Sequence, residues 1–117
     1  MRVTTVYVDL PVPDIASARD FYAGYLGMTD ESINMDWVTR FTATGSGASV
    51  QVVTQDATAP ESPIATIRVD DVEEAFAEAR RRGYEIVHPL TTEPWGVRRF
   101  FVRAPDGNVL NIAQHRD

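Results

Sequence analysis

The feature that most constrains the fold of this chain is an internal repeat. The segment VPDIASA at residues 12–18 returns in weaker form as VDDVEEA at residues 69–75, about half a chain length later. Half of a 117-residue chain is too short to bury a good core by itself, so the two copies must share one. The repeat therefore predicts two copies of one supersecondary unit.

Each copy carries the pattern of an amphipathic helix. Apolar residues recur at the helical period over about Ile15–Leu26 and Val72–Arg82, and a glycine follows each segment. Asp14 and Asp71 stand where an N-cap is expected. The residues predicted to face inward are Ile15, Ala18, Tyr22, Tyr25 and Leu26 in the first helix, and Val72, Ala75, Phe76 and Ala79 in the second.

One strand-like segment precedes each helix and three follow it, separated by turn residues. The predicted strands are Val3–Leu10, Thr29–Asn34, Trp37–Ala43 and Ala48–Thr54, and then Ile64–Val69, Glu85–Thr92, Val97–Arg103 and Val109–Gln114. The unit is βαβββ and the fold class is α+β. We expect a single domain over residues 1–117, with module one at about 1–55, a Pro-rich linker at 56–63 and module two at about 64–117.

Alternation within the strands separates an apolar face from a mixed polar, aromatic and small one. In the first strand Val6, Val8 and Leu10 share one face, while Tyr7 and Asp9 share the other. Helices on one face of such a sheet bury that face and leave the other wetter. The mixed face suits a ligand-holding concavity, but it suits a solvated sheet face as well, and the pattern alone favours the solvated face.

Composition excludes several classes of function. The formal net charge is −6, which disfavours nucleic acid and anionic membranes as partners. No cysteine is present, so disulfides, thiolate metal sites and cysteine nucleophiles are excluded. No apolar run is long enough to span a bilayer, and the N-terminus lacks the features of a secretory signal. We expect a cytoplasmic protein.

Two motifs in the chain resemble those of a known family. FYAGYLGM at residues 21–28 and PWGVRRFFVRAPDGN at residues 94–108, together with the βαβββ repeat, resemble the vicinal oxygen chelate superfamily. This superfamily contains glyoxalases, extradiol dioxygenases and bleomycin resistance proteins. The resemblance covers essentially the whole chain and implies mixed sheets that curl into a cup with helices outside, in a homodimer. Ala104 departs from the aspartate that is usual before the Pro-x-Gly turn.

The resemblance also locates the positions at which related proteins bind a divalent metal. Carried onto this chain, they are Tyr7, Gln51, Ile64 and Asn111, none of which supplies the imidazole or carboxylate that such metals prefer. His88 and His115, the two histidines, lie at other positions and are interpreted as structural or surface residues. We therefore expect no metal and no other cofactor, as in the bleomycin resistance branch.

Three functions stay open at this stage. The first is a metal-free protein that binds a small molecule, such as an antibiotic or an aromatic or cationic metabolite, and confers resistance by sequestering it. The second is a lyase, isomerase or dioxygenase-like enzyme in the same cup, with Asp9 or Glu93 as a general base if buried. The third is an accessory domain with a role in assembly. The residues expected to contact a ligand are Tyr7, Asp9, Trp37, Phe41, Gln51, Trp95 and Asn111.

Trp95 raises the sharpest question about the site. It follows Pro94 and precedes Gly96, at the entrance to the strand Val97–Arg103. Its indole either packs on its own hairpin or forms a wall of the ligand site, where its ring offers a stacking face for aromatic or cationic ligands. The position in a loop, away from the helix-facing strand positions, favours the wall.

Overall fold

The computed structural model describes the backbone of residues 1–115 and their side chains except that of Asn34. The chain forms two compact units. The N-terminal unit is Tyr7–Ser62, and the C-terminal unit combines Met1–Val6 with the residues from Pro63 onward. No helix within the described part of the chain is long and apolar enough to cross a membrane.

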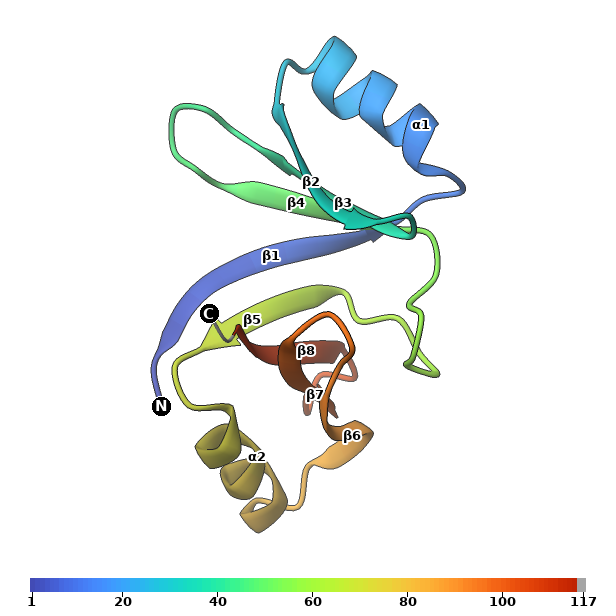
Figure 1. Ribbon diagram of the computed structural model, residues 1–117. Coiled ribbons are helices and arrows are strands. Elements are labelled where there is room, and N and C mark those ends of the chain that lie inside the picture. The colour runs from blue at the N-terminus through green and yellow to red at the C-terminus, as the bar shows by residue number, and fades with distance from the viewer. Residues whose placement is uncertain (116–117) are drawn as a thin grey trace. The chain divides into compact units, whose positions relative to one another are not determined.

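The N-terminal unit is a four-stranded sheet with one helical segment on it (Figure 1). The strand order is β2-β3-β4-β1, in which β1 and β4 are parallel and the other neighbours are antiparallel. The core lies between the helix and the sheet, where Ala18, Phe41 and Val52 are buried. The elements are β1 (Val3–Pro11), α1 (Ile15–Arg19), η1 (Asp20–Tyr25), β2 (Thr29–Met35), β3 (Val38–Thr42) and β4 (Ser49–Val53).

The first helix begins where the sequence predicts, but its second half differs from an ordinary α-helix. Asp14 caps it by accepting a hydrogen bond from the Ser17 backbone N–H at 2.7 Å. From Asp20 the chain continues as the π-helix η1. The wider π turn changes the direction in which later side chains point. The prediction that Tyr25 and Leu26 face inward is consequently wrong, because they are 76% and 52% exposed.

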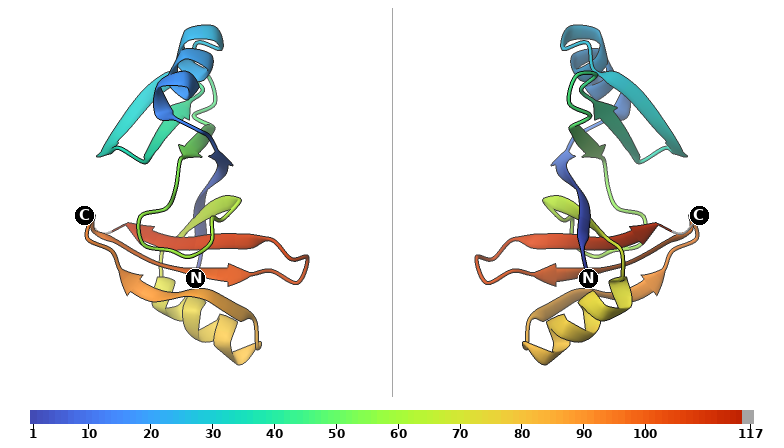
Figure 2. Two further views of the ribbon diagram at one scale, coloured as in Figure 1. Left: turned by 90° about the vertical axis from the view of Figure 1, so that its right-hand side faces the viewer. Right: turned by 90° about the vertical axis from the view of Figure 1, so that its left-hand side faces the viewer.

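The C-terminal unit repeats the arrangement with one regular α-helix, which lies along one face of its strands (Figure 2). The strand order is β1-β5-β8-β7-β6, with β5 and β8 parallel and β6, β7 and β8 antiparallel. The N-cap Asp71 accepts a hydrogen bond from the Glu74 backbone N–H at 3.0 Å. The elements are β5 (Ala65–Val69), α2 (Val72–Arg81), β6 (Glu85–Thr92), β7 (Val97–Arg103) and β8 (Val109–His115).

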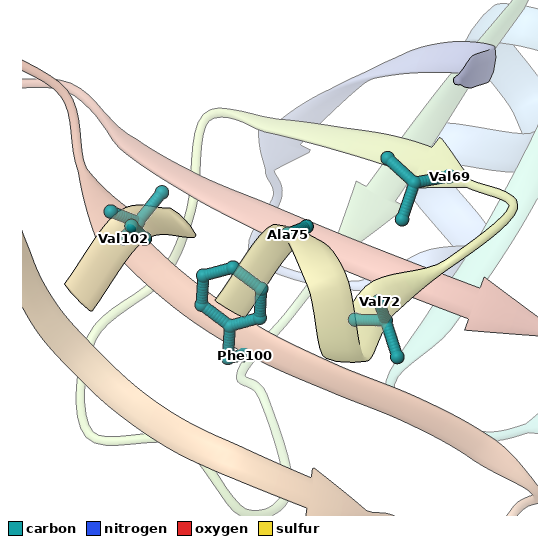
Figure 3. Packing of buried hydrophobic residues seen from close by; sticks show 6 residues of the cluster. Val69, Val72, Ala75, Phe100 and Val102 are labelled. Atoms are coloured by element: carbon teal, nitrogen blue, oxygen red, sulfur yellow. The ribbon is translucent and has the colours of Figure 1, made fainter. Parts of the chain in front are cut away.

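The core of the C-terminal unit forms where α2 packs on the sheet. Val72 and Ala75 of α2 meet Phe100 and Val102 of β7, as Figure 3 shows. The Phe76 ring, as predicted for an inward residue, lies edge-on to the Phe100 ring, with 5.1 Å between ring centres. Phe100 and Val102 thereby fix which side of β7 faces the helix, and Arg99 and Phe101, which alternate with them, belong to the opposite face.

The first residues of the chain belong to the C-terminal unit, whereas the repeat had placed them in module one. The Arg2 backbone N–H donates to the Asp70 carboxylate at 2.7 Å, and the Asp70 N–H donates to the Arg2 carbonyl. The N-terminal ammonium group also pairs with Glu74 at 3.0 Å. β1 therefore contributes residues to both units. The α+β class and the two βαβββ repeats are confirmed.

Candidate functional site

In each unit the sheet face opposite the helix is polar, and it is more buried than the sequence suggested. In β1, Val6 and Val8 are 55% and 46% exposed, whereas Tyr7 and Asp9 are 6% and 5% exposed. The helix covers the sheet near Phe41 and leaves Val8 outside the core cluster. The interpretation of the mixed face as a solvated one is therefore wrong at these positions.

A cluster of buried charged side chains lies on the polar face of the C-terminal unit. The Glu93 carboxylate oxygen Oε2 is 2.6 Å from Arg99 Nε and 3.2 Å from His88 Nε2. All three residues are less than a tenth exposed. Burial of a charge is costly unless it is paired, so this ion pair is expected to hold its members in place. His88 is thus a structural residue of the face, and it is buried within the ion-pair cluster.

The Trp95 ring lies next to this cluster because of the turn that carries it. The Glu93 N–H donates to the Val97 carbonyl at 2.8 Å, and the Gly96 N–H donates to the Glu93 carbonyl at 3.0 Å. Gly96 has φ of 90°, a backbone conformation that favours glycine. The Arg99 guanidinium lies 5.0 Å from the centre of the Trp95 ring. Trp95 is half-buried, so part of its ring surface stays accessible beside Arg99.

Asn111 lies on the same face and keeps an unsatisfied polar atom. It is opposite Thr66 in the β5–β8 ladder, and its Nδ2 donates to Thr66 Oγ1 at 3.1 Å. Its Oδ1 is buried and has no hydrogen-bond partner among residues 1–115. Buried polar atoms without a partner are rare in folded proteins, and each requires an explanation.

The polar face of the N-terminal unit contains a second network. Gln51 donates from Nε2 to Asp9 Oδ1 at 3.0 Å, and its Oε1 accepts from Arg40 Nη2 at 3.3 Å. The Arg40 guanidinium lies 4.1 Å from the centre of the Tyr7 ring. The structure therefore brings together three residues predicted for the site, Tyr7, Asp9 and Gln51. Sequence reasoning missed Arg40, for which the signal was a charged residue in the middle of a strand.

The two remaining aromatic candidates occupy different surroundings. Phe41 is fully buried and stacks on Tyr22 under the helix, with 5.4 Å between ring centres. Phe41 is therefore a core residue of the N-terminal unit, and its contact with a ligand stays a prediction. Trp37 lines an open hollow of about 410 Å³. The other residues lining this hollow are Asp36, Thr54, Gln55, Asp56 and Ala57.

The positions that hold a metal in related proteins do not fit one here. The Gln51 amide is bonded at both ends, and a guanidinium covers Tyr7. Ile64 offers no donor atom and is 49% exposed, and Asn111 offers only a neutral amide. Within the part of the chain that the structure describes, no group of three or more His, Asp or Glu side chains lies close enough together to hold a metal ion.

Known structures share this fold. The crystal structure of NAD-dependent benzaldehyde dehydrogenase from Legionella pneumophila has a TM-score of 0.78 and 19% identity, covering 95% of this chain and 99% of that one. A glyoxalase/bleomycin resistance protein/dioxygenase superfamily member from Vibrio splendidus has a TM-score of 0.65 and 19% identity, and 97% of each chain is covered. At these identities the likeness shows the fold alone.

A Mn(II)-bound glyoxalase from Novosphingobium aromaticivorans has a TM-score of 0.66 and 23% identity. The match covers 99% of this chain and 42% of the glyoxalase chain. No curated protein matches the sequence. The family model for the Glyoxalase/Bleomycin resistance protein/Dioxygenase superfamily matches residues 4–112, nearly the whole chain. The chain therefore belongs to the glyoxalase/bleomycin resistance protein/dioxygenase superfamily.

Proposed function

We propose that this protein binds a small organic molecule on the polar face of its C-terminal unit, without a resident metal. The observation that carries the proposal is the Asn111 Oδ1 atom, a buried acceptor without a partner within residues 1–115. Leaving such an atom unsatisfied costs about 1–3 kcal/mol. A ligand that donates an N–H or O–H group to Asn111 would recover that free energy.

Trp95 supports an aromatic part in the ligand. Tryptophan presents a large apolar surface for stacking, and this one is held in place by a short turn. The Arg99 guanidinium already lies over its ring, so a ligand cation at the same place would meet a like charge. We therefore propose a neutral or anionic aromatic ligand and not a cationic one. Sequestration of such a metabolite or antibiotic is the role that this binding would serve.

A second proposal is acid–base catalysis of a lyase or isomerase reaction, favoured by the contact between His88 and Glu93. The position of Arg99 weighs against it. Arg99 Nε and His88 Nε2 both contact the same Glu93 oxygen, Oε2, so this oxygen is already occupied before any substrate binds. Turnover of any substrate that is lost in Glu93→Gln, with ligand binding retained, would favour this proposal over simple binding.

The binding proposal is tested with two variants in a ligand screen by tryptophan fluorescence and calorimetry. Asn111→Leu should weaken binding of a hit by about 10–100-fold and change the free energy of unfolding by less than about 1 kcal/mol. The matched control is Asn108→Leu, since Asn108 is exposed in the β7–β8 turn. If both variants bind the hit as the wild type does, Asn111 is not a ligand contact.

Trp95→Ala tests the aromatic wall. We expect loss of ligand-induced fluorescence quenching and weaker binding by about 1–3 kcal/mol. An unfolded variant whose folded fraction keeps its affinity would instead make Trp95 a packing residue.

A further inference from the structure

Arg40 is held rigidly in the N-terminal unit. Its guanidinium lies against the ring of Tyr7, which is 6% exposed, and Nη2 donates to Gln51. Gln51 cannot turn freely, because its Nε2 is tied to the carboxylate of Asp9, which is 5% exposed. A buried acid thus orients an amide, and the amide orients the arginine. Supporting contacts of this kind preorganise a binding group.

The same guanidinium lacks the acceptors that an arginine normally has. Its Nε is buried from solvent and has no hydrogen-bond partner among residues 1–115. Its interactions in that part of the chain are the hydrogen bond to Gln51 and the contact with Tyr7, and no carboxylate forms an ion pair with it. Arg19 of the same unit differs, since it pairs with Asp30. Burial of a charged donor without an acceptor is costly, and an acceptor supplied by a ligand would recover that free energy.

From this geometry we propose that Arg40 binds the carboxylate group of a small molecule. A guanidinium is planar and presents neighbouring N–H groups that match the two oxygens of a carboxylate. The fixed orientation on Tyr7 reduces the entropy that such a ligand would otherwise cost on binding. The inference concerns the N-terminal unit by itself and goes beyond the proposed function: this unit has a site of its own, and the ligand of that site is an acid.

The test compares benzoate, benzamide and benzylamine, which share a ring and differ in the charge of the attached group. Each is titrated into the wild type at constant ionic strength while the arginine Nε–H signals are followed by NMR. Arg40→Lys, whose spectrum lacks one signal, identifies the Arg40 resonance. We expect benzoate to move this signal to saturation, and the amide and the amine to leave it in place.

Affinity measurements on variants complete the test. Arg40→Lys keeps the charge and loses the planar pair of donors, so benzoate should bind at least about tenfold more weakly. The control Arg19→Lys should bind benzoate as the wild type does. Inorganic phosphate distinguishes a carboxylate site from a general oxyanion site. The proposal is overturned if phosphate binds Arg40 more tightly than benzoate, if benzamide shifts the signal equally, or if about 50 mM benzoate gives no saturable shift.

Failure of this inference is distinguishable from failure of the proposed function. A ligand whose binding depends on Asn111, together with no saturable shift of the Arg40 signal by benzoate, would remove the carboxylate site alone. Benzoate binding at Arg40, with no ligand sensitive to Asn111→Leu or Trp95→Ala, would remove the proposed face of the C-terminal unit and keep the inference.

Discussion

The buried ion pair between Glu93 and Arg99 gives the most direct test of the polar face as a desolvated environment. Glu93→Gln keeps the shape of the side chain and removes its charge. Arg99 then remains charged at 4% exposure, with its Nε facing a neutral amide. Removing one partner of a buried ion pair costs about 3–5 kcal/mol when the other charge is left alone.

Arg99 keeps other contacts, which lowers the expected loss. Its guanidinium lies 5.0 Å from the Trp95 ring centre and 4.8 Å from that of Phe101, and each such contact is worth about 0.5–2 kcal/mol. We therefore expect Glu93→Gln to lower the free energy of unfolding by about 2–3 kcal/mol. Replacing both partners, in Glu93→Leu with Arg99→Met, should recover most of this loss because no charge is left buried.

Urea denaturation followed by circular dichroism measures these differences, with the slope m unchanged if the variants stay two-state. The matched control is Glu85→Gln, which breaks the Arg103–Glu85 pair of the same sheet. In that pair the side chains are 33% and 61% exposed, so the loss should stay below about 0.5 kcal/mol. If Glu93→Gln is no more destabilising than Glu85→Gln, the polar face is not desolvated and the proposed function loses its physical basis.

Three further predictions concern the core, the helix cap and metal content. Phe100→Ala should cost about 3–5 kcal/mol in denaturation experiments, since Phe100 is 1% exposed and packs on Phe76; Tyr25→Ala, at 76% exposure, should cost less than about 0.5 kcal/mol. Hydrogen bonds from the Ser17 N–H and hydroxyl lower the pKa of Asp14 below its ordinary 3.8. The stabilisation by this carboxylate is present above that value and is lost as pH falls through the lower folded pKa. The loss of stability on acidification below about pH 4 should therefore be less steep in Asp14→Asn than in the wild type. Elemental analysis of the purified protein should find far less than about one metal ion per chain, whether zinc, nickel, manganese or iron. The reason is that the family's metal-ligand positions hold two amides, a tyrosine and an isoleucine here.

Local sequence signals predicted most of the backbone. Strands β6 and β7 have the predicted bounds, and α2 differs from its prediction by one residue, because apolar period and capping residues act over short distances. The π turn after Arg19 has no comparable signal, and it moved Tyr25 and Leu26 out of the predicted core. The alternation of residue types correctly predicted which residues share a strand face, as for Tyr7 and Asp9. It did not predict how far that face is buried from solvent.

The side-chain networks were harder to predict because they depend on register. Arg40 and Gln51 meet because they are paired residues of β3 and β4, and neither the turn length nor the pattern fixed that pairing in advance. The contact between Glu93 and Arg99 is easier to predict from the sequence, since the two residues lie on either side of one tight turn. Opposite charges on the two sides of one predicted hairpin turn therefore indicate a possible ion pair, even though Arg99 pairs in the ladder with Thr91 and not with Glu93.

The two amides at the family's metal positions differ in a way that leads to a last prediction. Gln51 is bonded at both ends, to Asp9 and to Arg40, whereas one end of Asn111 lacks a partner within residues 1–115. Gln51→Glu would place a carboxylate, a ligand that divalent metals prefer, at one of these positions. The introduced carboxylate would lie between a guanidinium and the Asp9 carboxylate, so attraction and repulsion of similar size would leave stability within about 1 kcal/mol of the wild type.

Function should change more than stability in this variant. The new carboxylate would pair with Arg40 and occupy the donors that an acidic ligand needs, so benzoate affinity should fall by at least about tenfold. Metal binding should not appear, because the charge of Arg40 adjoins the position and no histidine lies on it. Calorimetric titration with Mn²⁺ and with benzoate measures both effects. Stoichiometric Mn²⁺ binding to Gln51→Glu, or unchanged benzoate binding, would show that Arg40 does not govern the chemistry of this face.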